Sequence, residues 1–171
     1  MPVIEKIAGE GADIIPIMSE ASYFTDTRFG NSEIFIDKLS DISKKEVIKT
    51  ITEAEPIGPK RLLDILLIMP CTGNTLAKLS HGICDSSVTL AVKAHLRNNK
   101  PVVIAVSTND GLGTAAENIG RLLNRKNMYF VPFGQDDCVN KPNSLVADFN
   151  QAPETIKAAL KGEQLQPILL R

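Results

Sequence analysis

The sequence predicts an α/β fold in which helices wind around both faces of a parallel sheet. Two short and continuously apolar runs, 64–69 and 101–107, are typical of strands that are buried on both faces. Segments of helical periodicity follow each run, so strands and helices alternate along the chain. Such alternation implies right-handed crossovers and a doubly wound parallel sheet. The length of 171 residues suits one domain, which we expect to span 1–171.

The beginning of the chain is unusual for this fold class. Residues 1–13 have the pattern of the second half of a helix that ends at Gly9 or Gly11. Residues 12–18 then predict a strand, with Pro16 tolerated at an edge or a bulge. A parallel α/β fold normally opens with a strand and a loop before such a helix. We therefore expect that first strand, and a phosphate-holding loop after it, to lie outside this sequence.

The elements that follow alternate as the fold class requires. Helical segments are expected at 31–42, where Asn31 or Ser32 can cap the N-terminus, and at 43–54. After the first buried strand, the pattern predicts two helices interrupted near Gly82, and later a helix, a strand and a last helix. The predicted ranges are 74–83 and 86–99 for the helix pair, then 113–126, 128–133 and 152–162.

Composition argues against several classes of protein. A formal net charge of -1 gives no basic surface for nucleic acid or an anionic membrane, so neither partner is expected. No apolar stretch reaches the roughly 18–20 residues that cross a bilayer, and no signal peptide is evident. The three cysteines, Cys71, Cys84 and Cys138, are odd in number and lack CxxC spacing. This disfavours a disulfide framework or a zinc site and favours a reducing cytoplasm.

Candidate ligand loops follow the two buried strands. Open α/β sheets bind ligands beyond the carboxyl ends of their strands. Here "PCTGNT" (70–75) and "STNDGLG" (107–113) are rich in small hydroxyl and amide residues. Such loops bind ligands through backbone N–H groups and helix dipoles, but they also form simple turns with helix caps. Both interpretations explain 70–75, and the second loop favours a binding site. Neither a dinucleotide fingerprint nor a P-loop is present.

The side chains with acid–base chemistry are less informative. His81 and His95 lie within helical segments, where a single histidine is more often packed or exposed than a base. Cys71, near the start of a helix, could have a lowered pKa, although a small buried turn residue is the simpler interpretation. Neither pattern identifies a catalytic residue.

Charged residues in two loops allow alternative interpretations. Arg28, in "TDTRFG", could hold a carboxylate with two hydrogen bonds, or could pair with Asp26. A second group lacks the histidine or further carboxylate of a metal site, so we expect a solvated loop and no metal there. That group consists of Asp136, Asp137 and Cys138.

Several segments resemble the flavoprotein family, which includes homo-oligomeric flavin-containing cysteine decarboxylases. "PCTGNTLAKLSHGICDS" is similar to that family's "PASANT" loop and the following helix, and "STNDGLGTAAENIGRL" to its "PAMN" segment. A narrower resemblance, to the family of dipicolinate synthase B subunits, covers essentially the whole chain. It rests on "TDTRFG", "EAEPIGPK", "LRNNKPVVIAVSTNDGLG", "NMYFVPFGQDD", "KPNSLVADF" and "LQPILL".

The resemblance implies a fold, a reaction and partners. It implies a Rossmann-like three-layer flavoprotein fold, FMN at the strand ends and a homo-oligomer. It also implies an oxidation that yields dipicolinate from dihydrodipicolinate or its hydrated precursor, a small dicarboxylate. The oxidant would be NAD(P) on the A subunit of dipicolinate synthase, which is the expected protein partner. The implied location is the mother-cell cytoplasm of a sporulating bacterium.

The predicted site residues fall in the strand-end loops. Arg28, Ser107 and Thr108 are predicted from the loop sequences themselves, and the others are implied by the resemblance. The substrate-binding residues are expected to be Arg28, Asn74 and Asn109, because amides and guanidinium donate to carboxylates. No catalytic residue is assigned. The residues expected to bind the cofactor are Ser19, Cys71, Thr72, Gly73, Asn74, Thr75, Ser107 and Thr108.

One departure from the resemblance leaves alternatives open. The decarboxylases place a catalytic histidine after their second strand, and this sequence has Tyr23 near that point. Cysteine decarboxylation is therefore not expected from the residues present. Two other functions stay open: a non-catalytic partner of the A subunit, since a fold can outlive its chemistry, and an FMN-dependent decarboxylase by analogy alone.

Overall fold

Three parallel strands form the centre of the fold. The computed structural model describes residues 1–27 and 30–170. In it, β2 (Val102–Thr108) lies between β1 (Leu66–Cys71) and β3 (Met128–Phe130) and pairs in parallel with both. Residues 102–106 of β2 are fully buried, which explains why this part of the strand is continuously apolar.

A small antiparallel extension lengthens the sheet at the carboxyl end of β2. There β5 (Leu145–Ala147) pairs with Ser107 and Thr108, and β4 (Phe133–Gly134) pairs with β5. The α/β fold class is thus confirmed, whereas the sheet is mixed and not wholly parallel. The extension was not predicted because its strands are only two and three residues long, too short to show an alternating pattern.

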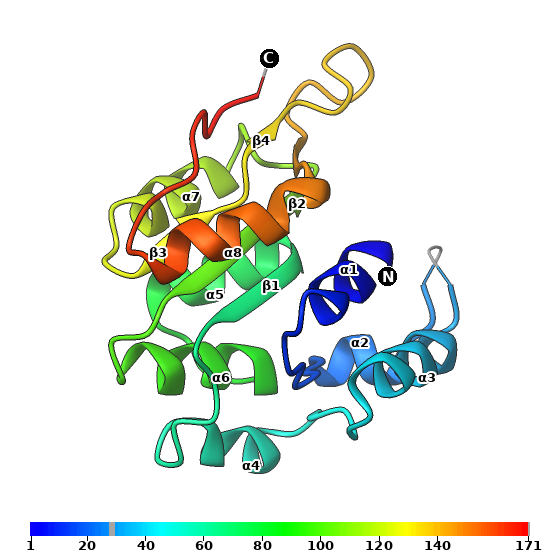
Figure 1. Ribbon diagram of the computed structural model, residues 1–171. Coiled ribbons are helices and arrows are strands. Elements are labelled where there is room, and N and C mark those ends of the chain that lie inside the picture. The colour runs from blue at the N-terminus through cyan, green and yellow to red at the C-terminus, as the bar shows by residue number, and fades with distance from the viewer. Residues whose placement is uncertain (28–29, 171) are drawn as a thin grey trace.

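Helices cover both faces of the sheet and give three layers (Figure 1). The crossovers from β1 to β2 and from β2 to β3 contain α5, α6 and α7, and α5 packs against α7. The last helix, α8, packs on β2 and β3 from the other face and also contacts α1. Their bounds are α1 Pro2–Gly9, α5 Gly73–His81, α6 Ser87–Leu96, α7 Ala115–Leu123 and α8 Ala152–Leu160, with a short 3-10 turn, η2, at Phe149–Gln151.

The predicted strand at 12–18 is wrong. This segment is extended, but its pairing is limited to Met18 N–H donating to Ile48 and Ile48 N–H donating to Pro16. Proline has no N–H of its own to donate to a ladder, so Pro16 can accept from a neighbour but cannot extend the pairing. The chain next forms α2 (Glu20–Phe24) and α3 (Ser32–Ser43), the latter as predicted and capped by Asn31.

The predicted helix at 43–54 is wrong in its first half. Lys44 adopts a left-handed conformation (φ 56°), which ends α3, and the chain then runs extended to Thr50. A capping box between Thr50 and Glu53 starts a new short helix. The elements here are α4 (Ile51–Ala54) and η1 (Glu55–Ile57).

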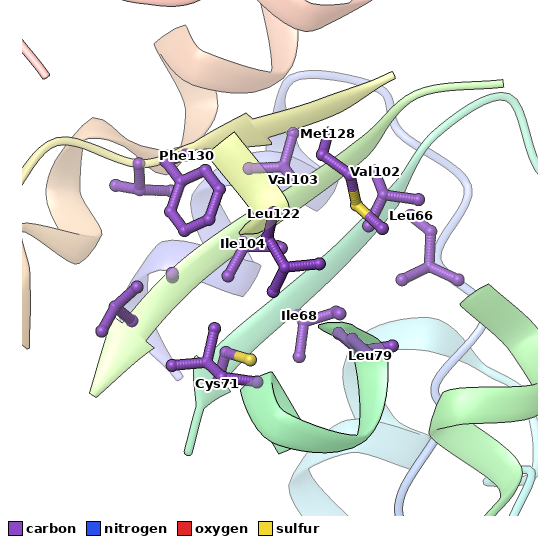
Figure 2. Packing of buried hydrophobic residues seen from close by; sticks show 14 of the residues in the cluster. Leu66, Ile68, Cys71, Leu79, Val102, Val103, Ile104, Leu122, Met128 and Phe130 are labelled. Atoms are coloured by element: carbon purple, nitrogen blue, oxygen red, sulfur yellow. The ribbon is translucent and has the colours of Figure 1, made fainter. Parts of the chain in front are cut away.

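The hydrophobic core lies between the central strands and the helices on both faces of the sheet, and Figure 2 shows part of it. Phe130, Ile104 and Leu122 are fully buried in it. Cys71 ends β1 inside the same cluster, with its side chain directed toward the other labelled core residues. Among the helices of the described residues, none is long and apolar enough to cross a membrane.

Candidate functional site

Two loops at the carboxyl edge of the parallel strands enclose a hollow of about 330 Å³. This volume is at the lower end of the range of small-molecule pockets. One wall is the start of α5, and the other is the loop after β2 together with the start of α7. The hollow is lined by Gly73, Asn74, Ala77, Thr108, Asp110, Thr114, Ala115 and Asn118.

The first wall begins with a self-capped helix. The Thr72 hydroxyl accepts from the N–H of Thr75 at 3.4 Å, and the two threonine hydroxyls lie 3.2 Å apart. A Cβ on Gly73 would lie 2.8 Å from the Thr108 hydroxyl oxygen, so only glycine lets the two walls approach this closely. The N–H groups of Gly73 and Asn74, the first two of α5, have no partner within the helix.

The second wall is organised by Asp110. Its Oδ1 accepts from the N–H of Thr114 at 3.2 Å, and its backbone oxygen accepts from Gly113 and Ala115. Any Cβ on Gly113 would overlap Asp110 Oδ1, so glycine is required for the carboxylate to reach this position. The carboxylate therefore closes the turn that leads into α7 and lies near the N-terminus of that helix, where the helix dipole favours a negative charge.

Sequence reasoning missed Asn118, which lies in the middle of α7. It is 7% exposed, and its Oδ1 accepts from the Ser80 hydroxyl of α5 at 2.5 Å. The signal was available, because Asn118 shares one helical face with the buried residues Ala115, Ile119 and Leu122. A polar residue on a buried face needs a hydrogen-bond partner or a ligand.

The histidines and Cys71 serve structural roles. Burial raises the pKa of the Cys71 thiol to about 12, so the alternative of a lowered pKa is wrong. His95 is buried, its Nε2 lies 3.0 Å from the Pro101 carbonyl, and burial lowers its pKa. His81 is exposed and its Nδ1 lies 2.9 Å from the Ala77 carbonyl.

The acidic loop near the end of the chain forms a hydrogen-bonded turn. Asp137 accepts from the backbone and the side chain of Asn140, and these bonds lower the pKa of its carboxyl. Asp136 pairs with Lys141. Across residues 1–27 and 30–170, no three His, Cys, Asp or Glu side chains are grouped closely enough to hold a metal ion.

A second hollow, of about 540 Å³, lies on the N-terminal side of the fold. It is lined in part by Tyr23, Lys49 and Glu53. The Lys49 ammonium donates to the Tyr23 hydroxyl at 3.3 Å and lies 4.6 Å from the centre of its ring. Glu53 is committed to capping α4, and its hydrogen bonds to the Lys49 and Thr50 N–H groups lower its pKa. This hollow holds none of the residues predicted to bind cofactor or substrate.

Comparison with known proteins identifies the family. The Flavoprotein family matches residues 1–152. The chain belongs to the flavoprotein family. The B subunit of dipicolinate synthase from Bacillus subtilis (strain 168) is 47% identical over 169 residues, which cover 99% of this chain and 84% of that protein.

Solved structures of the flavoprotein family share the fold. The crystal structure of the dipicolinate synthase B subunit from Bacillus halodurans C has a TM-score of 0.92 and 46% identity, covering 99% of this chain and 87% of that one. The FMN binding protein AtHal3 has a TM-score of 0.60 and 20% identity, with 90% and 85% covered. At this identity the second comparison shows a common fold only.

The loops typical of the flavoprotein family supply only part of the hollow. Of the residues predicted to bind cofactor or substrate, Gly73, Asn74 and Thr108 line it. Ser19 caps α2, where its hydroxyl accepts from Ser22, and Arg28 lies outside the described residues. The remaining predicted residues flank the hollow without lining it: Cys71, Thr72, Thr75, Ser107 and Asn109.

Proposed function

We propose that this chain is the B subunit of a dipicolinate synthase. Together with the A subunit it oxidises dihydrodipicolinate, or its hydrated precursor, to dipicolinate in the mother-cell cytoplasm of a sporulating bacterium. NAD(P), held on the A subunit, receives the hydride. The observation that carries the proposal is the 47% identity to the B subunit of a dipicolinate synthase over 99% of this chain.

The hollow is proposed as the ligand site of this protein. Its lining offers the amide of Asn74, the hydroxyl of Thr108 and the first N–H groups of α5. These neutral donors suit the carbonyl oxygens of a planar ring, because they bind without titrating. Their task in the reaction is to orient the ring and exclude water from one of its faces.

A flavin ring fits this set of donors. FMN is bound by relatives of the same fold, as the name of AtHal3 states. When bound, a flavin supplies a two-electron acceptor. Asn74 and Thr108 would contact its ring edge, whereas the lining residues of the hollow include no cation for its phosphate. The phosphate is therefore expected to lie beyond the hollow, and Ser19 is a candidate donor to it.

A non-catalytic role in supporting the A subunit is the second candidate. It is favoured by the placement of the histidines, since neither His81 nor His95 lines the hollow and His95 is buried. Aromatisation of the ring supplies much of the driving force, so orientation by this chain is enough for the first proposal. The two candidates differ in whether the residues of the hollow affect turnover.

Reconstitution with the A subunit tests the proposal. The full chain and the A subunit, each separately and then together, are supplied with dihydrodipicolinate and NAD(P), and dipicolinate is followed by its ultraviolet absorbance. We expect the pair to be at least about 100-fold faster than the isolated A subunit, the scale of proper orientation of reactants. Asn74→Ala should lower turnover about tenfold, the cost of one lost hydrogen bond to the ring. Asn150→Ala, at an exposed position distant in sequence from both loops, should leave turnover unchanged.

Two results separate the candidates. If the isolated A subunit reaches the full rate, the catalytic role of this chain is rejected. If the pair is needed but Asn74→Ala turns over like the wild-type chain and the complex still forms, the supporting role is correct. Release of carbon dioxide from a peptidyl-cysteine would instead identify a decarboxylase.

A further inference from the structure

The outer edge of β3 has no neighbouring strand. Among the described strands, β3 pairs only with β2. On that side the N–H of Val131 donates to Ile104, so the backbone groups of Phe130, one residue earlier, point to the opposite side. Such an edge presents N–H and C=O groups to which another strand can add. Residues 128–131 favour the addition, because they are uncharged and of high β propensity.

One side chain occupies this edge. The Gln164 carboxamide makes both bonds that a neighbouring strand would make with Phe130. Its Oε1 accepts from the Phe130 N–H at 2.7 Å, and its Nε2 donates to the Phe130 carbonyl at 2.7 Å. A carboxamide carries the same donor and acceptor as a peptide group, so it can replace one unit of a strand. Phe130 is fully buried, and these bonds satisfy its backbone groups.

The segment that carries this glutamine continues along the edge as a strap. We use this name for residues 163–170, which follow α8 and run beside β3 and β4 (Figure 1). The N–H of Phe133 donates to the Ile168 carbonyl at 3.0 Å, and the N–H of Leu170 donates to the Phe133 carbonyl at 2.9 Å. The strap thus bonds to Phe133 through its backbone but to Phe130 through a single side chain. The bonds at Phe130 therefore depend on one residue.

We propose that Gln164 keeps the β3 edge from pairing with the β3 edge of a second copy of this chain. Without the carboxamide, the Phe130 N–H and C=O groups of two copies can bond to each other across a two-fold axis, as an antiparallel pair. That pair makes the same two bonds that Gln164 makes, so the strap and a second copy compete for the same groups. Pro132 limits the pairing to a few residues, because proline has no N–H to donate. The inference concerns assembly and does not depend on the proposed function.

Sedimentation velocity of the full chain at several protein concentrations tests the proposal. Gln164→Leu removes both bonds at nearly constant volume. We expect it to form at least about tenfold more of species larger than the wild-type assembly, the effect of losing a competing hydrogen-bonded pair. Gln164→Glu keeps the acceptor for the Phe130 N–H and loses the donor, so it should form an intermediate amount. The matched control Gln135→Leu makes the same change at an exposed position between β4 and β5 and should sediment like the wild-type protein.

Hydrogen exchange of the Phe130 amide shows which surface pairs. In the wild-type protein this amide should be protected at every protein concentration, because Gln164 is bonded to it. In Gln164→Leu it should exchange at least about tenfold faster at low concentration, the effect of one lost hydrogen bond. At high concentration it should regain protection, because β3 then pairs between copies. A role confined to the stability of one chain would give the same fast exchange at every concentration.

A second substitution assigns the larger species to the β3 edge. Tyr129 is half-buried and lies next to Phe130 in β3. Tyr129→Lys places an ammonium group on the edge, and a lysine there disfavours pairing because the charge would lose its water. Combined with Gln164→Leu, it should return the sedimentation pattern to that of the wild-type protein. Alone, it should leave that pattern unchanged.

Three results would reject the proposal. They are a folded Gln164→Leu variant that sediments like the wild-type protein at every concentration, larger species that persist when Tyr129→Lys is added, and Phe130 exchange that does not depend on concentration. Thermal unfolding establishes whether each variant is folded. If Gln164→Leu does not fold, the same measurements on Gln164→Glu decide, because that variant keeps one of the two bonds. None of these measurements uses synthase activity, so their outcome is separate from that of the proposed function.

Discussion

Replacing Gly111 with alanine is expected to lower the free energy of unfolding by about 1–3 kcal/mol, the usual cost of overpacking. An added Cβ would lie 2.5 Å from Cγ and 2.6 Å from Cβ of Leu145. Leu145 is 7% exposed and belongs to β5, which is hydrogen-bonded to β2, so it has little freedom to move away. The 109–114 loop must shift instead, and with it Asp110 and the second wall of the hollow.

Urea unfolding measures this cost, and Gly120→Ala is the matched control. Gly120 lies on the exposed side of α7, and a Cβ there meets nothing within 4 Å. Alanine is favoured over glycine inside a helix, so this variant should gain up to about 1 kcal/mol. A lower free energy of unfolding for Gly111→Ala together with a higher one for Gly120→Ala would show that β5 fixes the loop. A Gly111→Ala variant as stable as the wild-type protein would contradict this.

Alkaline conditions are expected to destabilise the protein through Cys71. Its pKa is raised to about 12 by burial, so the folded state keeps the thiol proton while the unfolded state loses it near the ordinary cysteine pKa. The stabilisation is fully present below that ordinary value and is lost as pH rises toward 12. Linkage gives a slope of about 1.4 kcal/mol per pH unit, or roughly 3 kcal/mol in total between pH 9 and 11.

The difference between wild-type protein and Cys71→Ala isolates this effect from the titration of tyrosine and lysine. At pH 7 the variant should be less stable, because it leaves a small cavity in the core. With rising pH the two unfolding curves should converge. The control Cys138→Ala removes an exposed thiol and should follow the wild-type slope. Parallel curves for wild-type protein and Cys71→Ala would show that the thiol is accessible to water.

Local sequence patterns predict the elements whose burial is uniform. β2 is apolar from Val102 to Val106 because both of its faces are covered there. Gly82 ends α5 in a left-handed conformation, as its position before the next helix suggested. Sequence periodicity fails to predict the end of a helix where the conformation of a single residue ends it. The helical periodicity of the sequence continues to residue 54, but the left-handed conformation of Lys44 ends the helix. A lysine side chain does not favour a left-handed conformation, so the sequence gives no signal for this turn.

The site could be predicted by location but not in full by residue. Ligand-binding residues were expected in the loops after the two buried strands, and Gly73, Asn74 and Thr108 of these loops line the hollow. Asn118 lies inside α7 and not in a loop, so a search for ligand-binding residues among the strand-end loops does not find it. Asp110 belongs to the predicted loop 107–113, and it closes a turn there, since its Oδ1 accepts from the N–H of Thr114. Its second contribution, a charge in the hollow, depends on Gly113 and is visible only in three dimensions.

The residues that line the hollow differ in how easily they could be substituted during evolution. A side chain at Gly73 or Gly113 would displace the Thr108 hydroxyl or the Asp110 carboxylate, so a substitution at either glycine rearranges the polar groups of the hollow. Asn74 and Thr114, by contrast, are exposed lining residues whose side chains have no hydrogen-bond partner within the described chain. Changes at these two positions would alter ligand preference at little cost in stability. A search for variants with new specificity should begin with them.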